Sequence, residues 1–306
     1  MTQTRLGFAA IVSTRLAAIV STRLAAILTT LAMAGFASMD AMSKWLVRDY
    51  PITQTLWVRY VIFTGFALLV ARRAGVRSAL ASARPWLQAG RGLLALVENG
   101  VFVLAFAYLP LADTHAVAAA SPLIVVALSA LMLGEKAGLR RWLAVLAGFG
   151  GVLIIIRPGF QTLNGALLIP LFGAVLWALY QVLTRLTGRT DRAETTLLWS
   201  ALSGLAVTSL LAPWWWVWPD ASSWALLAAV GLLGSLSHYA LIKALDYAEA
   251  GAVQPYSYTL LVWAAILGVV VFGDIPDTGT IAGAVVVVLS GLATWFHDRP
   301  KAAPHG

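Results

Sequence analysis

The chain has 306 residues, of which 60% are hydrophobic and only 11% are charged, and its mean hydropathy is +0.84. A water-soluble domain carries roughly 25% charged residues, so this composition excludes a soluble globular protein and predicts a polytopic helical membrane protein. The sequence contains no cysteine, which excludes disulfide bonds, thiolate catalysis and cysteine metal sites.

The net charge of +8 does not indicate nucleic-acid binding, because the basic residues lie in short loops between apolar runs. No soluble segment carries a basic stripe with interleaved aromatic residues, the pattern expected of a nucleic-acid interface. Basic loops of this kind instead follow the positive-inside rule of membrane proteins. The expected partner is therefore a lipid bilayer and not a nucleic acid.

Ten apolar runs of about the length needed to cross a bilayer, roughly 17–25 residues, follow one another along the chain. Turn-forming sequences separate them, such as RPG at 157–159 and GDIPD at 273–277. The predicted spans are 24–47, 52–71, 86–109, 114–133, 142–156, 165–186, 195–212, 223–245, 252–272 and 279–296.

The segment before the first span contains STRLAAI twice, at a spacing of eight residues. A tandem duplication in a tolerant terminal tail is favoured over an amphipathic functional helix. In the fifth span, GFGGVL at 148–153 is too weak for a nucleotide-binding loop and indicates close contact with another helix.

The distribution of Lys and Arg predicts how the chain is oriented. With the N-terminus in the cytoplasm, sixteen of the 21 basic residues flank the spans on the inner side. Only Lys44, Arg48 and Arg157 fall on the outer side, and Arg59 and Arg91 lie within spans. Both termini are therefore predicted to be cytoplasmic, with the protein in the inner membrane.

The two halves of the chain resemble each other. SPLIVVALSALMLGEKAG at 121–138 matches LLVWAAILGVVVFGDIPDTG at 260–279, and MAGFASMDAMSKWL matches FGAVLWALYQVLTRL, so that Lys44 corresponds to Arg185. Because each half has five spans, the second half must be inserted upside down. Inverted repeats are typical of transporters. The predicted fold is an all-α protein of ten transmembrane helices, with a tail at 1–23, repeats at 24–160 and 161–297, and a second tail at 298–306.

The segment 109–159, with its Pro122, its Gly-Glu at a helix end and its glycine-rich span, resembles the EamA-type ten-helix transporters of the drug/metabolite transporter superfamily. Leu261 stands where this family usually has Pro, and Asp274 where it has Glu. The resemblance implies a transporter and not an enzyme. Similar members export amino acids, including aromatic ones, or carry other small metabolites.

Two charged pairs are expected near the outer face. At ~1.5 Å of rise per residue, Glu98 lies roughly 12 Å and Arg59 about 10 Å from the outer face of a ~30 Å core. A structural ion pair between them is favoured, and proton coupling through Glu98 or contact with a substrate's ammonium group stay open. Asp40 and Lys44 are four residues apart on one helix, which favours an intrahelical interfacial pair over an outer gate.

Aromatic and polar residues at mid-membrane depth are candidates for a substrate cavity, in which rings could stack on a ligand or hold a cation. Packing against lipid or the core is the alternative for each of them. The candidates are Glu98, Asn99, Phe102, Ser121, Trp177, Tyr180, His238, Tyr239, Ser257 and Tyr258.

Pro122 and Pro255 are expected to kink the fourth and ninth helices, either as gating elements or simply for packing. Neither His115 nor His238 has a metal-ligand partner at a workable spacing, and no Walker A motif is present, so no metal and no cofactor are expected.

The sequence thus predicts a monomeric secondary transporter that exports aromatic or large neutral amino acids, or related small metabolites, by alternating access. The alternatives are a multidrug or cation transporter, a carrier of another metabolite such as a nucleotide-derived one, a channel, and a membrane-embedded enzyme such as a lipid transferase. The enzyme would need paired catalytic groups near one interface, and the sequence offers no convincing pair.

Overall fold

The computed structural model describes residues 2–133, 138–156, 165–247 and 256–297, and every regular element in these ranges is a helix. Three of its apolar helices are short, at Trp142–Ile156, Thr259–Phe272 and Thr278–Ala293. Seven others are long and apolar enough to cross a membrane: Arg23–Leu46, Ile52–Arg73, Pro85–Tyr108, Leu111–Met132, Gly165–Thr187, Ala193–Trp215 and Ala221–Ala244.

The first half of the chain contains one short helix that the apolar pattern did not predict. This helix, α3, follows α2 before the chain enters the membrane again as α4. The helices of this half are α1 (Thr2–Leu46), α2 (Ile52–Ala74), α3 (Val76–Leu80), α4 (Pro85–Tyr108), α5 (Leu111–Ala118), α6 (Ser121–Leu133) and α7 (Leu139–Ile156).

The span predicted at 114–133 is divided into α5 and α6. Pro122 has no N–H, so it cannot donate the helical hydrogen bond to the carbonyl four residues earlier, which belongs to Ala118. The hydroxyl of Ser121 donates to that carbonyl instead, over 2.6 Å. The helix is therefore interrupted one turn before the proline, and the carbonyl that the proline frees already has a donor.

The second half repeats the plan of the first. Pro255, predicted to kink the ninth span, lies outside the described residues. The elements are η1 (Gly165–Leu167), α8 (Leu168–Thr187), α9 (Ala193–Leu211), η2 (Ala212–Trp215), α10 (Ala221–Tyr247), α12 (Thr259–Leu267), the π-helical turn η3 (Gly268–Phe272) and α13 (Thr278–His297).

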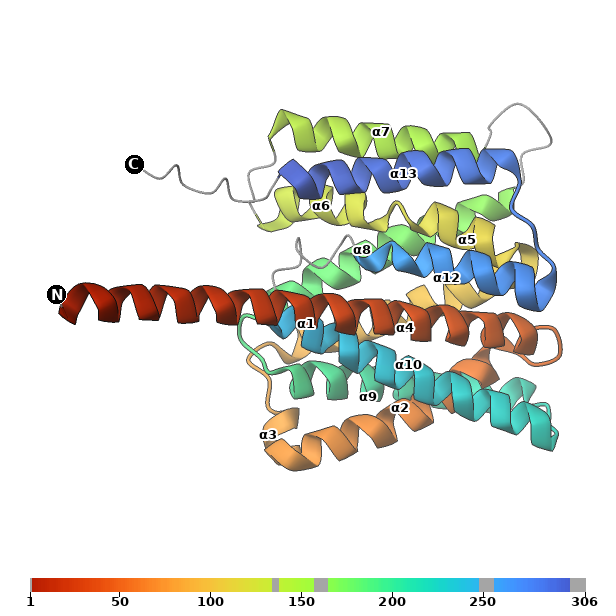
Figure 1. Ribbon diagram of the computed structural model, residues 1–306. Helices are drawn as coiled ribbons and strands as arrows, with labels where there is room; N and C mark the ends of the chain where they lie inside the picture. The colour runs from red at the N-terminus through yellow and green to blue at the C-terminus, as the bar shows by residue number, and fades with distance from the viewer. Residues whose placement is uncertain (1, 134–137, 157–164, 248–255, 298–306) are drawn as a thin grey trace.

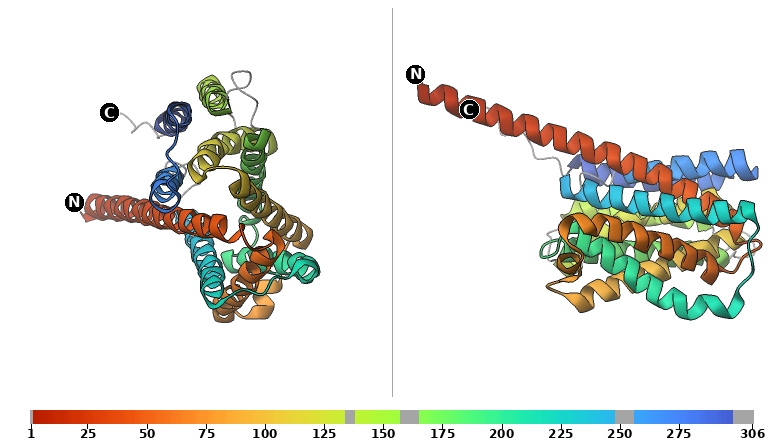
Figure 2. Two further views of the ribbon diagram at one scale, coloured as in Figure 1. Left: turned by 90° about the vertical axis from the view of Figure 1, so that its right-hand side faces the viewer. Right: turned by 90° about the horizontal axis from the view of Figure 1, so that it is seen from below.

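Helix α1 begins and α13 ends at the same end of the bundle (Figure 1). We call this the α8–α9 end, after the turn at 188–192, and the opposite one the α1–α2 end, after the turn at 47–51. At ~1.5 Å per residue, the 45 residues of α1 extend about 68 Å, more than twice a ~30 Å hydrocarbon core. The start of α1 therefore projects beyond the other helices (Figures 1 and 2).

The helix pairings repeat between the halves. Helix α1 packs against α10 and α12, and α8 packs in the same way against α4 and α6. Helix α2 packs against both α9 and α10, and α9 against both α2 and α4. Exchanging the corresponding helices of the two halves reproduces these pairings, an arrangement that fits two related repeats.

Buried apolar residues form clusters around the centre of the bundle. One cluster joins α6, α7, α8 and α13 and includes Leu123, Val152 and Val287. A second joins α1 to α10 around Phe36 and Val230, and a third joins α2, α4 and α9. The space between these clusters holds the polar side chains described below.

Helices α7 and α13 lie side by side at one edge of the bundle (Figure 1). A methyl group at Gly151 would come within 2.8 Å of the backbone oxygen of Gly283, so the two backbones approach too closely for a side chain. The prediction that GFGGVL permits close helix contact is confirmed.

Candidate functional site

A cavity lies between the two halves, walled by α1, α2, α4, α5, α6, α8, α10 and α12. It encloses about 880 Å³ of space between protein atoms, including any part open to solvent. Its polar and aromatic lining residues are Phe36, Asp40, Arg59, Glu98, Asn99, Phe102, His115, Ser121, Trp177, Gln181, His238, Ser257 and Tyr258.

Most of the candidate residues from the sequence lie on this wall, together with Pro122. Two candidates do not. Tyr180 is buried behind Trp177, and Tyr239 packs against Phe66 of α2, away from the cavity. The sequence did not single out Phe36 or His115 as site residues, because only the folded arrangement of α1 and α5 brings them to the wall. Contact of any wall residue with a substrate stays a prediction.

The aromatic part of the wall is held in a fixed orientation. Trp177 stacks on Tyr180, with ring centres 5.4 Å apart and planes at 21°. Phe36 meets the ring of Trp177 edge-on at 6.3 Å and that of His238 edge-on at 4.8 Å. The Nδ1 of His238 lies 3.0 Å from the backbone oxygen of Gly234. These contacts limit the rotation of the rings, so the site offers a preformed aromatic surface.

The predicted contact pair between Arg59 and Glu98 is not formed. Both side chains are buried and line the same cavity. They do not lie at ion-pair distance from each other, nor does either from any other charged group that the structure describes. Both groups therefore border the cavity and neither neutralises the other by direct contact.

The predicted pair between Asp40 and Lys44 is also wrong. The two residues point to different partners, since Oδ2 of Asp40 lies 3.3 Å from Nε2 of His115 on α5. His115 stacks on Phe102, with ring centres 6.3 Å apart. The spacing of four residues suggested a local pair, but long-range partners across helices displace it.

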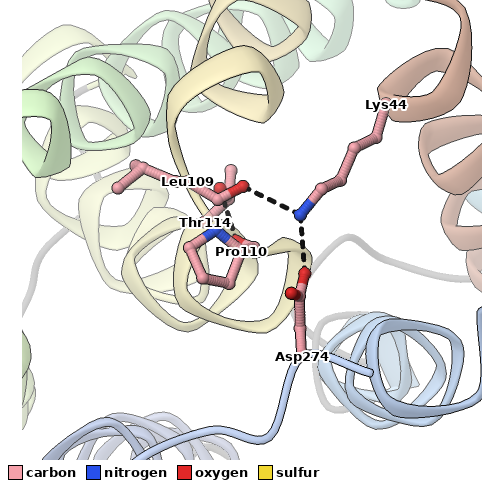
Figure 3. Close-up of polar contacts among 5 residues, drawn as sticks. All are labelled: Lys44, Leu109, Pro110, Thr114 and Asp274. Atoms are coloured by element: carbon pink, nitrogen blue, oxygen red, sulfur yellow. Dashed lines mark hydrogen bonds and ion pairs between the residues drawn. The ribbon is translucent and has the colours of Figure 1, made fainter. Parts of the chain in front are cut away.

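Lys44 connects the two halves at the α1–α2 end. Its Nζ lies 2.6 Å from Oδ2 of Asp274 and donates to the backbone oxygen of Leu109 over 3.1 Å (Figure 3). Asp274 is presented by a helix C-terminus, where Gly273 has φ +69° and the N–H of Asp274 donates to the oxygen of Gly268. We call Lys44, Leu109 and Asp274 the Lys44 bridge; it lies one helical turn beyond Asp40.

A second polar cluster lies toward the α8–α9 end. Arg91 on α4 is fully buried and donates to Gln88, to Thr184 on α8, and to the backbone oxygen of Thr196 and the hydroxyl of Ser200 on α9. Its guanidinium also lies 5.1 Å from the ring centre of Tyr180. We call these residues the Arg91 cluster. The sequence placed Arg91 inside a span but could not identify its partners.

Asp191 in the turn between α8 and α9 joins the Arg91 cluster to the start of α4. Its carboxylate accepts hydrogen bonds from Gln88, from Ser82 and from the backbone N–H of Ala83. Partial burial raises the pKa of Asp191, but these hydrogen bonds outweigh it and hold the pKa below its usual value. The carboxylate therefore stabilises the folded turn in its ionised form.

Together, the two sets of contacts cross-link the halves beyond both ends of the cavity. Within the described ranges, no group of three or more His, Asp or Glu residues is arranged to hold a metal ion. The arrangement provides a cavity with few polar groups and a fixed aromatic face.

Comparison with known proteins identifies the family. The model of the EamA-like transporter family matches residues 23–157 and, a second time, residues 163–295. The chain belongs to the EamA-like transporter family, part of the drug/metabolite transporter superfamily. The two matches fit the two-repeat architecture, and EamA membership means that the protein is a multi-pass membrane transporter.

Relatives in this family include carriers of several compounds. The chain is 31% identical over 242 residues to the riboflavin transporter of Vibrio cholerae, covering 78% of this chain and 81% of the relative. It is 27% identical to the S-adenosylmethionine uptake transporter of Rickettsia prowazekii, over 85% and 88% of the two chains. It is 29% identical to the pseudopaline exporter of Pseudomonas aeruginosa, over 86% and 93%. These names give no support to the predicted amino-acid substrate.

One solved crystal structure has the same fold. Its sequence is 20% identical, and the superposition has a TM-score of 0.62 over 88% of this chain and 97% of the other. This likeness concerns the fold alone.

Proposed function

We propose that this EamA-family protein is a secondary transporter that carries a small metabolite with a flat ring system by alternating access. The observation that carries the proposal is the cavity between the halves, whose wall combines the held ring of Trp177 with a few polar groups. In inverted-repeat transporters the substrate site lies between the repeats near the membrane midplane. In alternating access, the Lys44 bridge and the Arg91 cluster would break in turn, so that the cavity opens first at one end of the bundle and then at the other.

The names of the relatives support a heteroaromatic metabolite as the substrate. Riboflavin carries a flat ring system and S-adenosylmethionine carries an adenine ring, and both rings could stack on Trp177 and Phe102. A second candidate is the export of an aromatic amino acid. The observation that favours it is that a basic and an acidic side chain, Arg59 and Glu98, both border the cavity, which suits a ligand with an acidic and a basic group.

We further propose that the three shorter apolar helices also cross the bilayer, which gives ten spans in the inner membrane with both termini in the cytoplasm. The location of the start of α1 and the end of α13 at one end of the bundle supports this arrangement (Figure 1). The excess of Lys and Arg at the α8–α9 end supports placing that end inside.

The test is uptake by proteoliposomes that contain the purified protein, with labelled riboflavin, S-adenosylmethionine, L-tryptophan and tetraphenylphosphonium as separate probes. A ring-bearing metabolite should accumulate, and Trp177→Ala should lower its initial rate roughly tenfold or more, because stacking on a ring is worth about 1–3 kcal/mol. Trp263→Ala, which removes an exposed ring from α12, is the control and should leave the rate unchanged. Equal rates in the two variants would exclude Trp177 from the site.

A further inference from the structure

Arg59 is a buried charge on the wall of the cavity. The residue is only 5% exposed, and it borders the cavity from α2. Its guanidinium lies against the backbone of α10, where a methyl group added at Gly234 would come within 3.2 Å of Nε. The glycine therefore makes room for the arginine beside the cavity.

A guanidinium stays protonated in proteins and carries five N–H donors, so burying it is costly unless the donors and the charge are satisfied. Arg91 provides a comparison within the same protein. It is also buried, and its three nitrogens donate to four groups at 2.6–3.3 Å. Among the described residues, Arg59 has no hydrogen-bond or ion-pair partner of this kind. Glu98 borders the same cavity but does not lie at ion-pair distance from Arg59.

This contrast separates a structural arginine from one that is available to a ligand. Arg91 holds α4 to α8 and α9 with all of its nitrogens, whereas the guanidinium of Arg59 has unused donors at the edge of an empty space. A ligand that brings an oxyanion into the cavity would satisfy these donors and the charge together. Guanidinium groups bind carboxylates and phosphates through two parallel hydrogen bonds.

The other charges on the wall favour the smaller anion. Glu98 and Asp40 both border the cavity, and the carboxylate of Asp40 already faces His115. A doubly charged phosphate would meet the carboxylate of Asp40 on the same wall, whereas a carboxylate group brings a single negative charge. A cationic group on the same ligand could face Glu98.

We propose that Arg59 binds the carboxylate group of the transported metabolite and so selects carboxylated, ring-bearing compounds over their uncharged or decarboxylated analogues. This inference rests on the proposed function, because it assigns one contact within the same cavity. The ring of the ligand would lie on the aromatic wall formed by Trp177 and Phe102.

The experiment compares matched ligands in the proteoliposome assay. The pairs are L-tryptophan against tryptamine, S-adenosylmethionine against its decarboxylated form, and riboflavin 5′-phosphate against riboflavin. In at least one of the first two pairs, wild-type protein should take up the carboxylated compound roughly ten- to a hundredfold more efficiently than its decarboxylated partner. This is the range expected for hydrogen bonds to a charged group. Arg59→Gln should bring this ratio close to one while uptake of the decarboxylated compound continues.

Arg72→Gln is the matched control, because it removes an exposed positive charge from the same helix. It should leave the ratio as in the wild type. Arg59→Lys keeps the positive charge but loses the planar guanidinium that forms two parallel hydrogen bonds, so it should lower the uptake ratio only in part. This variant keeps the test decisive if Arg59→Gln does not fold.

Three outcomes would overturn the assignment. The first is an unchanged ratio in Arg59→Gln. The second is that the wild-type protein transports riboflavin but transports neither L-tryptophan nor S-adenosylmethionine. The third is a preference for riboflavin 5′-phosphate that Arg59→Gln removes, which would make phosphate the ligand. In all three cases the wild-type protein still transports, and the proposed function stands. Absence of transport for every probe would instead refute the proposed function itself.

Discussion

The buried polar side chains of this bundle differ mainly in whether other groups of the protein form hydrogen bonds or ion pairs with them. Arg91 and Asp191 belong to one continuous network that joins α4 to the turn between α8 and α9. Arg59 and Glu98 border a cavity without a direct partner between them. Since buried polar groups are costly when unpaired, the first network stabilises the fold, whereas the second set has the unpaired groups that we propose a ligand satisfies.

The pH dependence of stability should report on Asp191. Because hydrogen bonds depress its pKa in the folded protein, its contribution is fully present above the unfolded-state pKa of about 3.9. The contribution is lost as the pH falls below that value through the folded pKa. At pH 7, Asp191→Asn should lower the unfolding temperature in detergent by about 2–4 °C, the shift expected for roughly 1 kcal/mol.

A pH series of thermal unfolding checks this prediction, with Asp49→Asn as the control for loss of an exposed carboxylate. The difference between wild type and Asp191→Asn should be constant near neutral pH and shrink below about pH 4. A difference that stays the same at acid pH would show that the ionised carboxylate is not responsible.

At the scale of helices, the Lys44 bridge holds α1 against the turns that follow α4 and η3, which belong to opposite halves. We expect the cavity to open toward the α1–α2 end only when these contacts break. The bridge was not predictable from the sequence, since Asp274 lies 230 residues away and Asp40 is the only acidic residue at helical spacing. Local spacing identifies local partners only.

Breaking the bridge should expose the cavity from the α1–α2 end. The chain has no native cysteine, so Ser257→Cys is a unique reporter on the wall. Asp274→Asn should raise the rate of its labelling by a water-soluble maleimide roughly fivefold or more, because about 1–3 kcal/mol of charge-assisted contact is lost. The double exchange Lys44→Asp with Asp274→Lys should restore slow labelling. Identical rates in all three proteins would argue against a gating role.

The glycine contact between α7 and α13 gives a second prediction for helices. Gly151→Leu should destabilise the protein by about 1–3 kcal/mol, because the new side chain must displace the backbone of Gly283. Gly150→Leu is the matched control, since a methyl group there meets no atom within 4 Å. Unfolding in detergent measures both, and equal stability of the two variants would contradict the close contact.

At the scale of the whole molecule, the long apolar helices were predictable because their length and composition are set by the bilayer. The spans predicted at 24–47, 86–109 and 223–245 begin and end within two residues of observed apolar helical segments. The short helix α3 was missed, since it does not change the apolar pattern, whereas the interruption of the fourth span at Pro122 was expected from the proline itself. The wall of the cavity was predictable only in part. Depth can be estimated from sequence, but the direction in which Tyr180 or Tyr239 points depends on helix packing.

The orientation of the molecule follows from its charge distribution and can be tested directly. Basic residues are concentrated at the α8–α9 end, and moving such charges across the membrane during insertion is unfavourable, so this end should face the cytoplasm. With no native cysteine to interfere, Asp49→Cys and Arg189→Cys each place one exposed thiol at opposite ends of the bundle. An impermeant maleimide added to intact spheroplasts should label Asp49→Cys, and it should label Arg189→Cys only after the membrane is opened. The reverse pattern would invert the proposed topology, and labelling of both thiols in intact spheroplasts would show that the protein inserts in two orientations.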